Sequence, residues 1–143
     1  MAIGGSPRAE RPLKGLIAED DYISGVLLSK VVQKWGSARI VRNGKQAIEA
    51  VSTALENQEP YDLICLDVMM PEMDGHQALS EIRALEAAMG FTEANRAKIV
   101  MTSASDHYET VMAAIKGQCD YFLCKPVRQE KLEEVLRKLA LII

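Results

Sequence analysis

Polar side chains of complementary chemistry follow four short apolar runs of this sequence. They are Glu19, Asp20 and Asp21 after the first run, Asp67 after the third, Thr102 and Ser103 at the end of the fourth, and Lys125 after the fifth. Clustered carboxylates repel one another and favour a hard cation, and Mg²⁺ takes oxygen ligands together with waters and a phosphate oxygen. A carboxylate beside such a cation can attack phosphorus and form an acyl phosphate. The cation, a lysine and a hydroxyl would stabilise the charge of the transferring group.

The apolar runs themselves are typical of buried strands. We expect strands over Leu13–Ala18, Ala38–Val41, Leu63–Leu66, Lys98–Thr102 and Tyr121–Cys124. The run at Leu63–Leu66 is apolar throughout, which indicates a strand that is buried on both of its faces.

Between these runs, apolar residues recur at helical spacing. The segment Tyr22–Trp35 is expected to be a helix that ends at Gly36, and Asn43 and Asp74 are expected to cap the next two helices. The predicted apolar stripes are Ile23, Leu27, Val31 and Trp35; Ala47, Ile48, Val51 and Leu55; Leu79, Ile82, Leu85 and Met89; Tyr108, Val111, Met112 and Ile115, before a stop at Gly117; and Leu132, Val135, Leu136 and Leu139.

Strand and helix thus alternate five times, which predicts an α/β fold of the (βα)5 type. Such a chain forms a doubly wound, five-stranded parallel sheet with helices on both faces. Ligands of these folds bind beyond the carboxyl ends of the strands, where the strand order reverses. An acidic residue after a strand often only caps the next helix, and a single Lys-Pro is often only a turn. Four such placements at the correct strand ends together favour one shared site.

Length and composition limit the class of protein. The chain has 143 residues, of which 48% are hydrophobic and 26% charged, as in one soluble domain. Its net charge of −3 argues against direct binding of nucleic acid. No apolar run approaches the roughly 18 residues of a membrane span, so no membrane contact is expected. Residues 1–12 are expected to be a flexible N-terminal leader, without the apolar core of a signal peptide, and residues 13–143 to be the domain.

The cysteines predict a reducing compartment. Cys65 and Cys124 lie in strand-like apolar runs and are expected to be buried thiols, and Cys119 makes the number odd. The two histidines, His76 and His107, do not form a cluster with them, so no Cys/His metal site is expected. We therefore expect a cytoplasmic protein.

Four motifs of this chain together resemble the signature of bacterial two-component receiver domains. They are Glu19-Asp20, the stretch LDVMMPEMDG over residues 66–75, Thr102-Ser103 and Lys125-Pro126. The LDVMMPEMDG stretch is highly specific, and the resemblance covers the chain from Leu13 to Leu141. It implies the flavodoxin-like, chemotaxis-regulator-like receiver fold with strand order 2-1-3-4-5. It also implies a phosphorylated signalling domain of a phosphorelay.

The resemblance assigns roles to the acidic residues. Asp67 corresponds to the aspartate that accepts the phosphoryl group. Asp20 corresponds to a direct ligand of Mg²⁺ (or Mn²⁺), and Glu19 would act through a bound water. Met69 would contribute only its backbone carbonyl to the metal. Asp21 is then an extra acid that caps the first helix.

The same resemblance assigns roles around the phosphoryl group. Thr102 corresponds to the switch hydroxyl, and Lys125 to the lysine that pairs with a phosphoryl oxygen. The peptide bond between Lys125 and Pro126 is expected to be cis. Phe122 stands where the family usually has tyrosine, and it is expected to turn between an outward and an inward pose without a hydroxyl to hold either.

The resemblance further implies partners. A sensor histidine kinase or a histidine phosphotransfer protein would supply the phosphoryl group and would dock on the first helix, around Ser24–Leu28. An output partner or a second copy would bind the fourth helix, fifth strand and fifth helix, including Tyr108, Val111, Tyr121 and Phe122. The domain would be no enzyme beyond self-phosphorylation from small donors and self-dephosphorylation.

Two other functions fit part of the pattern. Phosphatases of the haloacid-dehalogenase type also use an aspartate after a parallel strand. They need a second aspartate two residues later as general acid, and Met69 stands there. A degenerate receiver that only docks partners is expected to lack the acceptor, an acid or the lysine, and this chain has all three. The chain ends soon after its last expected helix, which fits a stand-alone receiver as well as a piece of a longer protein.

Overall fold

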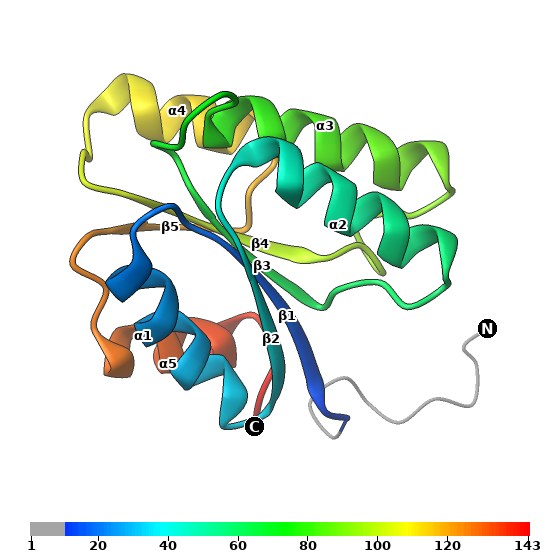
Figure 1. Ribbon diagram of the computed structural model, residues 1–143, viewed down its shortest axis with the longest axis horizontal. Helices are drawn as coiled ribbons and strands as arrows, with labels where there is room; N and C mark the ends of the chain where they lie inside the picture. The colour runs from blue at the N-terminus through cyan, green and yellow to red at the C-terminus, as the bar shows by residue number, and fades with distance from the viewer. Residues whose placement is uncertain (1–10) are drawn as a thin grey trace.

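The computed structural model describes residues 11–143 as five strands that are each followed by a helix (Figure 1). The elements are β1 (Leu13–Ala18), α1 (Tyr22–Gln33), β2 (Gly36–Val41), α2 (Gly44–Glu56), β3 (Leu63–Asp67), α3 (Gly75–Ala88), β4 (Lys98–Ser103), α4 (Tyr108–Lys116), β5 (Tyr121–Cys124) and α5 (Gln129–Lys138). All strand pairs are parallel, in the order β2-β1-β3-β4-β5. The predicted (βα)5 fold and strand order are confirmed. The predicted leader lies almost entirely outside the described residues.

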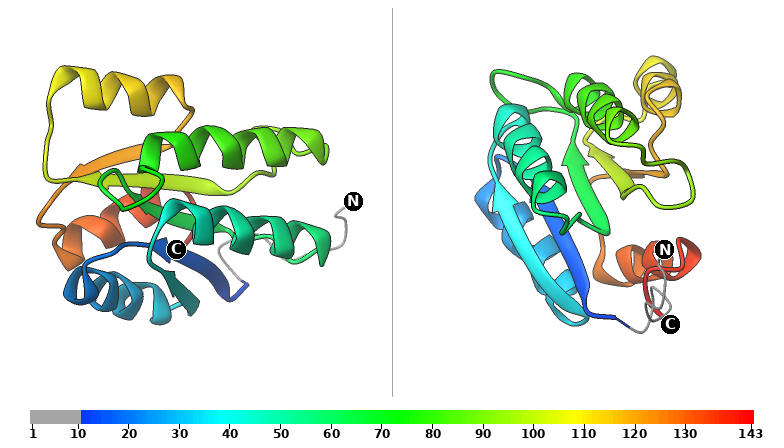
Figure 2. Two further views of the ribbon diagram at one scale, coloured as in Figure 1. Left: turned by 45° about the horizontal axis from the view of Figure 1, so that its top comes forward. Right: turned by 90° about the vertical axis from the view of Figure 1, so that its right-hand side faces the viewer.

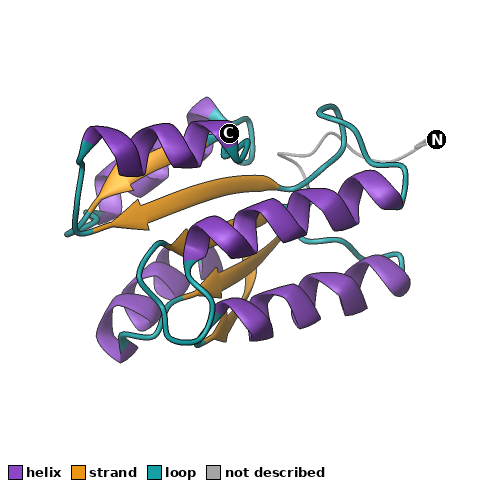
Figure 3. Ribbon diagram, turned by 90° about the horizontal axis from the view of Figure 1, so that it is seen from above, coloured by secondary structure: helices purple, strands orange, loops and turns teal. Residues whose placement is uncertain are grey.

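The helices form a layer on each face of the sheet (Figures 1 and 2). Helices α1 and α5 cover one face, and α2, α3 and α4 cover the other, where α2 and α3 lie side by side (Figure 3). Successive strand residues alternate between the two cores: Leu16 and Ile64 face α2 and α3, whereas Ile17 and Cys65 face α1 and α5. No helix within residues 11–143 is long and apolar enough to cross a membrane.

Helix α1 buries Val31 of the predicted apolar stripe, but its other buried residues differ from those predicted. Its buried residues are Gly25, Leu28, Ser29, Val31 and Val32. Ile23 and Leu27 of the predicted stripe are 67% and 58% exposed, and Trp35 is half-buried after the end of the helix. Gly25 packs closely on the sheet, since a Cβ atom added there would be in ordinary van der Waals contact with Ile40 at 3.5 Å and with Glu19 at 3.8 Å. The helix therefore packs through a face that combines Leu28, Val31 and Val32 with the small residues Gly25 and Ser29.

Gly36 does not stop a helix but begins β2, two residues earlier than predicted. A Cβ atom at this position would lie 1.9 Å from the backbone oxygen of Leu13. Only glycine allows this close approach of β2 to β1. The contact explains why a residue that resembles a helix stop belongs to the sheet.

The predicted stripe of α4 and one predicted thiol are also more exposed than expected. Tyr108 and Ile115 are 76% and 56% exposed, and Ala114 is the one buried residue among those of α4. Small residues again provide the contact, since a Cβ atom at Gly117 would lie 2.6 Å from Leu79 of α3. Cys65 is buried as predicted, but Cys124, the last residue of β5, is exposed. All three cysteines are free thiols.

A buried ion network joins α3 to the amino ends of β4 and β5, and the sequence analysis did not predict it. Arg83 donates to Glu86 at 2.7 Å and to Asp120 at 2.8 Å, and also to the backbone oxygens of Ala97 and Gln118. Glu86 accepts from the backbone amide of Ala97 as well. The network holds the long α3–β4 connection against the sheet. Its residues are far apart in sequence and carry no motif that would have revealed it.

Candidate functional site

Three carboxylates meet at the carboxyl ends of β1 and β3. Oxygen atoms of Glu19, Asp20 and Asp67 all lie within 4.8 Å of one another. The register of the sheet explains this, because Ala18 pairs with Leu66 and the next residue of each strand is acidic. Glu19 and Asp67 are buried, whereas Asp20 is exposed. The structure thus brings together the three acids that the sequence predicted to share a site.

Lys125 connects the two buried carboxylates. Its Nζ lies 2.8 Å from Glu19 Oε1 and 3.1 Å from Asp67 Oδ2. The backbone positions this side chain: the amide of Lys125 donates to the carbonyl of Ser103 in β4, and the Lys125–Pro126 peptide bond is cis. The sequence placed Lys125 at this edge, but its pairing with Glu19 was not predicted.

The electrostatics of this cluster are unbalanced. Burial, together with the hydrogen bond and charge of Glu19, raises the pKa of Asp67 to about 7 against the opposing effect of Lys125. Burial alone would lower the pKa of Lys125, but the two carboxylates outweigh it and raise that pKa. Glu19 Oε1 accepts no hydrogen bond of good geometry, although Lys125 lies close to it. One ammonium group therefore faces more negative charge than it can neutralise.

This excess of negative charge indicates whether the site suits a metal ion. Two buried carboxylates, an exposed third acid and a buried oxygen without a hydrogen bond form an oxygen-only donor set, as Mg²⁺ requires. The residues present therefore fit a divalent cation.

The β3–α3 connection is held close to Asp67. The amide of Met69 donates to Asp67 Oδ1 at 3.3 Å, and the amide of Gly75 donates to the carbonyl of Val68 at 2.9 Å. A Cβ atom at Gly75 would lie 2.3 Å from the backbone oxygen of Asp67, so glycine is required there. Asp74 and Gln77 form a capping box that begins α3 at this point. The Met69 side chain is 70% exposed.

Asp21 takes no part in the acidic cluster. Its carboxylate accepts from both the amide and the hydroxyl of Ser24, at 2.9 and 2.7 Å, and these hydrogen bonds lower its pKa. It is the N-cap of α1, as predicted, and Asn43 likewise caps α2. The sequence analysis therefore separated the cap from the cluster correctly.

The remaining predicted residues lie on β4 and β5. Thr102 is buried and pairs with Asp67 in the sheet register. Phe122 pairs with Met101 and is partly buried against the α2–α3–α4 core. Tyr121 points to the opposite face, where Lys131 and Lys138 lie over its ring.

Comparison with known proteins identifies the family. A sequence model of the response regulator receiver domain matches residues 16–137. The chain belongs to this family. Two-component response regulator ORR41 of rice is 32% identical over 133 residues, which cover 93% of this chain and 98% of that protein. Chemotaxis protein CheY of Listeria monocytogenes is 32% identical over 90% of this chain and 98% of its own length.

Solved structures agree with this assignment. The receiver domain of the Arabidopsis histidine kinase CKI1, crystallised with Mg²⁺, superposes with a TM-score of 0.79 at 30% identity, covering 93% of this chain and 95% of that one. The receiver domain of yeast Ssk1, solved with the phosphotransfer protein Ypd1, shares the fold, with a TM-score of 0.76 at 24% identity over 90% of this chain and 88% of that chain.

The relatives differ in what surrounds the domain. The chain spans only 7% of hybrid signal transduction histidine kinase L of Dictyostelium and 25% of transcriptional regulatory protein ZraR of Escherichia coli. The relatives come from plants, an amoeba and bacteria, so the likeness is not restricted to bacterial receivers.

Proposed function

We propose that this receiver domain carries its phosphoryl group on Asp67. The observation that supports this choice is the position of the Asp67 carboxylate, which is buried between two acids and 3.1 Å from Lys125 Nζ. An Asp67 oxygen attacks the phosphorus atom of a phosphohistidine. The new O–P bond forms as the P–N bond breaks, and the released imidazole takes a proton from solvent.

The acidic cluster would hold Mg²⁺, or Mn²⁺. Asp20 and Asp67 would be direct ligands, Glu19 would act through a water, and Met69 would contribute its backbone carbonyl. When bound there, the cation would neutralise charge on the transferring phosphoryl group. The fit of the donor set supports this assignment, and so does the Mg²⁺ complex of the CKI1 receiver.

Lys125 and Thr102 would bind the phosphoryl oxygens once they are attached to Asp67. Lys125 already lies beside Asp67 and can exchange its contact with Glu19 for a phosphoryl oxygen. Thr102 is the residue paired with Asp67 in β4, so its hydroxyl has a short path to the same group. Its movement would leave space for Phe122 to turn inward, which changes the α4–β5–α5 face.

The partners follow from this chemistry. A histidine kinase or histidine phosphotransfer protein would dock at α1, which borders the acidic cluster. Receiver segments similar to this chain occur within histidine kinases, which supports such a donor. An output partner or a second copy would bind the α4–β5–α5 face. Neither nucleic acid nor a membrane is proposed as a direct partner. The cytoplasm is the proposed location, consistent with three free thiols.

The test is phosphorylation by acetyl phosphate in Mg²⁺, followed by intact-mass spectrometry. The parent chain should gain one phosphoryl group, Asp67→Asn should gain none, and Asp106→Asn, an exposed acid on the β4–α4 connection, should behave as the parent. Labelling of the Asp67→Asn variant at the parent level would refute the proposal. Absence of label and of Mg²⁺ binding in the parent would indicate a degenerate receiver, and sustained hydrolysis of phosphate esters would indicate a phosphatase.

A further inference from the structure

The carboxyl end of α4 is tied to α3 and to the α3–β4 connection by two arginine side chains. Arg83 of α3 donates through Nε to the backbone oxygen of Gln118 at 3.0 Å and through Nη2 to Asp120 at 2.8 Å. Arg96 donates to the side-chain oxygen of Gln118 at 2.7 Å. We refer to these two arginines as the α4 clamp. They hold the α4–β5 connection through both its backbone and its side chains.

The backbone of the same connection forms a Schellman motif. The amide of Gln118 donates to the carbonyl of Ile115 at 2.9 Å, and the amide of Cys119 donates to that of Ala114 at 3.1 Å. Gln118 has a φ of 73°, a left-handed conformation that favours glycine and costs energy for other residues. Both residues of the clamp bind this one residue, so side chains and backbone fix the turn together.

The amino end of α4 is held less firmly. Among the described residues, its N-cap His107 makes no side-chain hydrogen bond to the helix, and Tyr108 is 76% exposed. The β4–α4 connection has local hydrogen bonds, from the amide of Ser105 to Ser103 Oγ and from the amide of His107 to Ser105 Oγ. Ala114, the buried residue of α4, belongs to its second half. Segments with few buried contacts open at a low cost in free energy.

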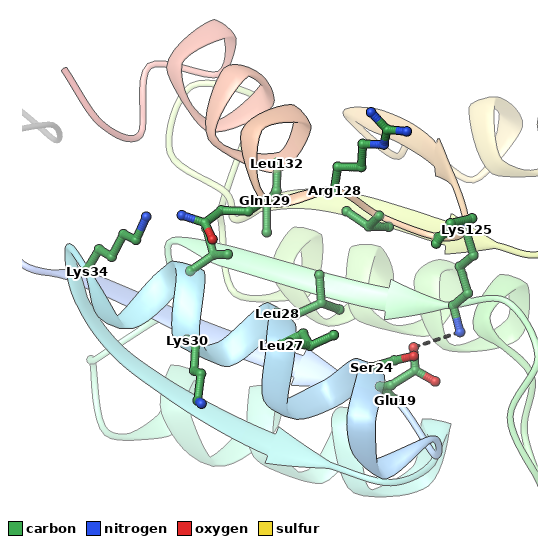
Figure 4. A pocket seen from close by; sticks show the side chains of 13 residues that line it. Glu19, Ser24, Leu27, Leu28, Lys30, Lys34, Lys125, Arg128, Gln129 and Leu132 are labelled. Carbon is green, nitrogen blue, oxygen red and sulfur yellow. Dashed lines mark ion pairs between the residues drawn. The ribbon is translucent and has the colours of Figure 1, made fainter.

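Strand β5 is anchored at both of its ends. Asp120, directly before the strand, accepts from Arg83 and also from the backbone amide of Ile99 in β4 at 2.8 Å. Lys125, directly after the strand, pairs with Glu19 at 2.8 Å, and Figure 4 shows this ion pair beside the pocket that α1 and the β5–α5 segment line. The freedom to move on this side of the molecule therefore lies at the amino end of α4.

That free end is also the one connected to the phosphoryl site. Thr102 and Ser103 are the last residues of β4, and the connection that follows them leads to His107. A displacement of Thr102 therefore reaches the amino end of α4 first. The carboxyl end of the helix lies beside the clamp, at the opposite end of β5 from Lys125.

We propose that Arg83 and Arg96 are positioning residues that confine the switch movement to the amino-terminal half of α4. The helix pivots about residues 117–120, so residues 105–112 move while the clamped end stays in place. This inference rests on the proposed function, since it specifies how phosphorylation would change the α4–β5–α5 face. An output partner that senses phosphorylation would then contact the Tyr108 end of α4.

Amide hydrogen exchange, followed by NMR with and without beryllofluoride and Mg²⁺, tests the pivot. Residues 117–120 of the free parent should exchange more slowly than Val111 and Met112, although the last turn of a helix ordinarily frays as readily as the first. Beryllofluoride should change the exchange of residues 105–112 and leave that of residues 117–120 unaltered. A change of similar size at both ends would overturn the inference, because the helix would then move as a whole.

Removal of the clamp should release the carboxyl end. Arg83→Lys keeps a cation but loses the hydrogen bond to the Gln118 carbonyl, so residues 117–120 should exchange about tenfold faster, and beryllofluoride should then alter both ends. Arg96→Gln removes the outer hydrogen bond, leaves the buried network intact and should accelerate the same amides about threefold. Unchanged exchange of residues 117–120 in both variants would refute the role of the clamp.

Glu86→Gln is the matched control for the loss of stability. The carboxylate of Glu86 binds Arg83 and the amide of Ala97, on the side of the network away from α4. After correction for global stability by urea unfolding, this variant should keep residues 117–120 protected and the effect of beryllofluoride confined to residues 105–112. Equal release of the carboxyl end by Glu86→Gln and Arg83→Lys would show a merely structural role and overturn the inference.

The outcomes separate this inference from the proposed function. Labelling of Asp67 by acetyl phosphate without any effect of beryllofluoride on residues 105–112 would refute the pivot alone. A chain that acetyl phosphate never labels, but in which Arg83→Lys still releases residues 117–120, would refute the proposed function and leave the clamp established.

Discussion

The two ends of the sheet hold buried clusters of similar composition that are built in opposite ways. At the amino ends of β4 and β5, Arg83 donates to two carboxylates and two carbonyls, and those carboxylates also accept backbone amides. At the carboxyl ends of β1 and β3, Lys125 is shared between Glu19 and Asp67, and Glu19 Oε1 accepts no hydrogen bond. One cluster satisfies its charges, and the other leaves negative charge uncompensated.

The difference shows how similar residues serve different purposes. A buried ion pair is stable when hydrogen bonds satisfy its atoms, and removing one partner is then strongly destabilising. A cluster with excess charge of one sign is destabilising until a ligand neutralises it, and perturbed pKa values mark such sites. The Arg83 network therefore stabilises the fold, whereas the acidic cluster fits the binding of a cation, as proposed above.

The largest expected effect is the loss of stability when Arg83 is replaced. Arg83→Met should lower the free energy of unfolding by about 3–5 kcal/mol, because Glu86 and Asp120 would lose their cationic partner. Arg83→Lys should lose less, since it keeps the charge. Urea unfolding at pH 7 measures both values. A loss below about 1 kcal/mol for Arg83→Met would contradict the stabilising role of the network.

The acidic cluster, in contrast, should destabilise the folded chain at neutral pH. The pKa of Asp67 is raised from 3.8 to about 7 in the folded chain. Between these two pH values the folded chain therefore keeps a proton on Asp67 that the unfolded chain has lost. Stability should therefore fall as the pH rises from about 4 to 7. Asp67→Asn should remove that fall and be more stable at pH 7 by about 1–2 kcal/mol without divalent cations. Urea unfolding of both chains between pH 4 and 8 tests this, and parallel curves would count against it.

Magnesium binding should distinguish the acids. Asp20→Asn should weaken Mg²⁺ binding on the order of tenfold, because a direct ligand is lost. Asp21→Asn is the adjacent control and should change it little, since that carboxylate is occupied by Ser24. Asp120→Asn, at the other end of the sheet, should leave Mg²⁺ affinity unchanged. Calorimetric titration gives all three values, and equal effects at Asp20 and Asp21 would show that the acidic pair is misplaced by one residue.

The smallest expected effect is a change in the conformation of the α4–β5 region when a phosphoryl mimic binds. Beryllofluoride with Mg²⁺, which imitates a phosphoryl group, should shift the amide NMR signals of residues 108–124 as well as those of the acidic cluster. Amides beside the Arg83 network, such as those of Glu86 and Ala97, should shift little. Changes confined to the cluster would leave a phosphoryl acceptor that does not switch.

The sequence predicted the fold and the acidic cluster because both depend on local pattern. Short apolar runs that alternate with helical stripes predict where each strand lies. A parallel sheet then brings the carboxyl ends of adjacent strands together. Glu19 and Asp67 thus meet because β1 and β3 are neighbours. The specific LDVMMPEMDG stretch added the family and its strand order.

The sequence did not predict features that depend on how the helices and strands pack against one another. The four-residue spacing of Ile23 and Leu27 resembled a core stripe, but Gly25 and Ser29 face the sheet instead. Gly36 resembled a helix stop, yet it permits the close approach of β2 to β1. The Arg83 network joins residues from three elements without a shared motif. Such contacts become visible only when the packing is known.

The location of the phosphoryl group tests the central claim most directly. The chain is phosphorylated with acetyl phosphate in Mg²⁺ and reduced with borohydride, which converts an aspartyl phosphate to homoserine. Peptide mass spectrometry then identifies the modified residue. The account predicts conversion at Asp67 and at no other acid, and conversion at Asp20, Glu19 or a residue outside the cluster would contradict it.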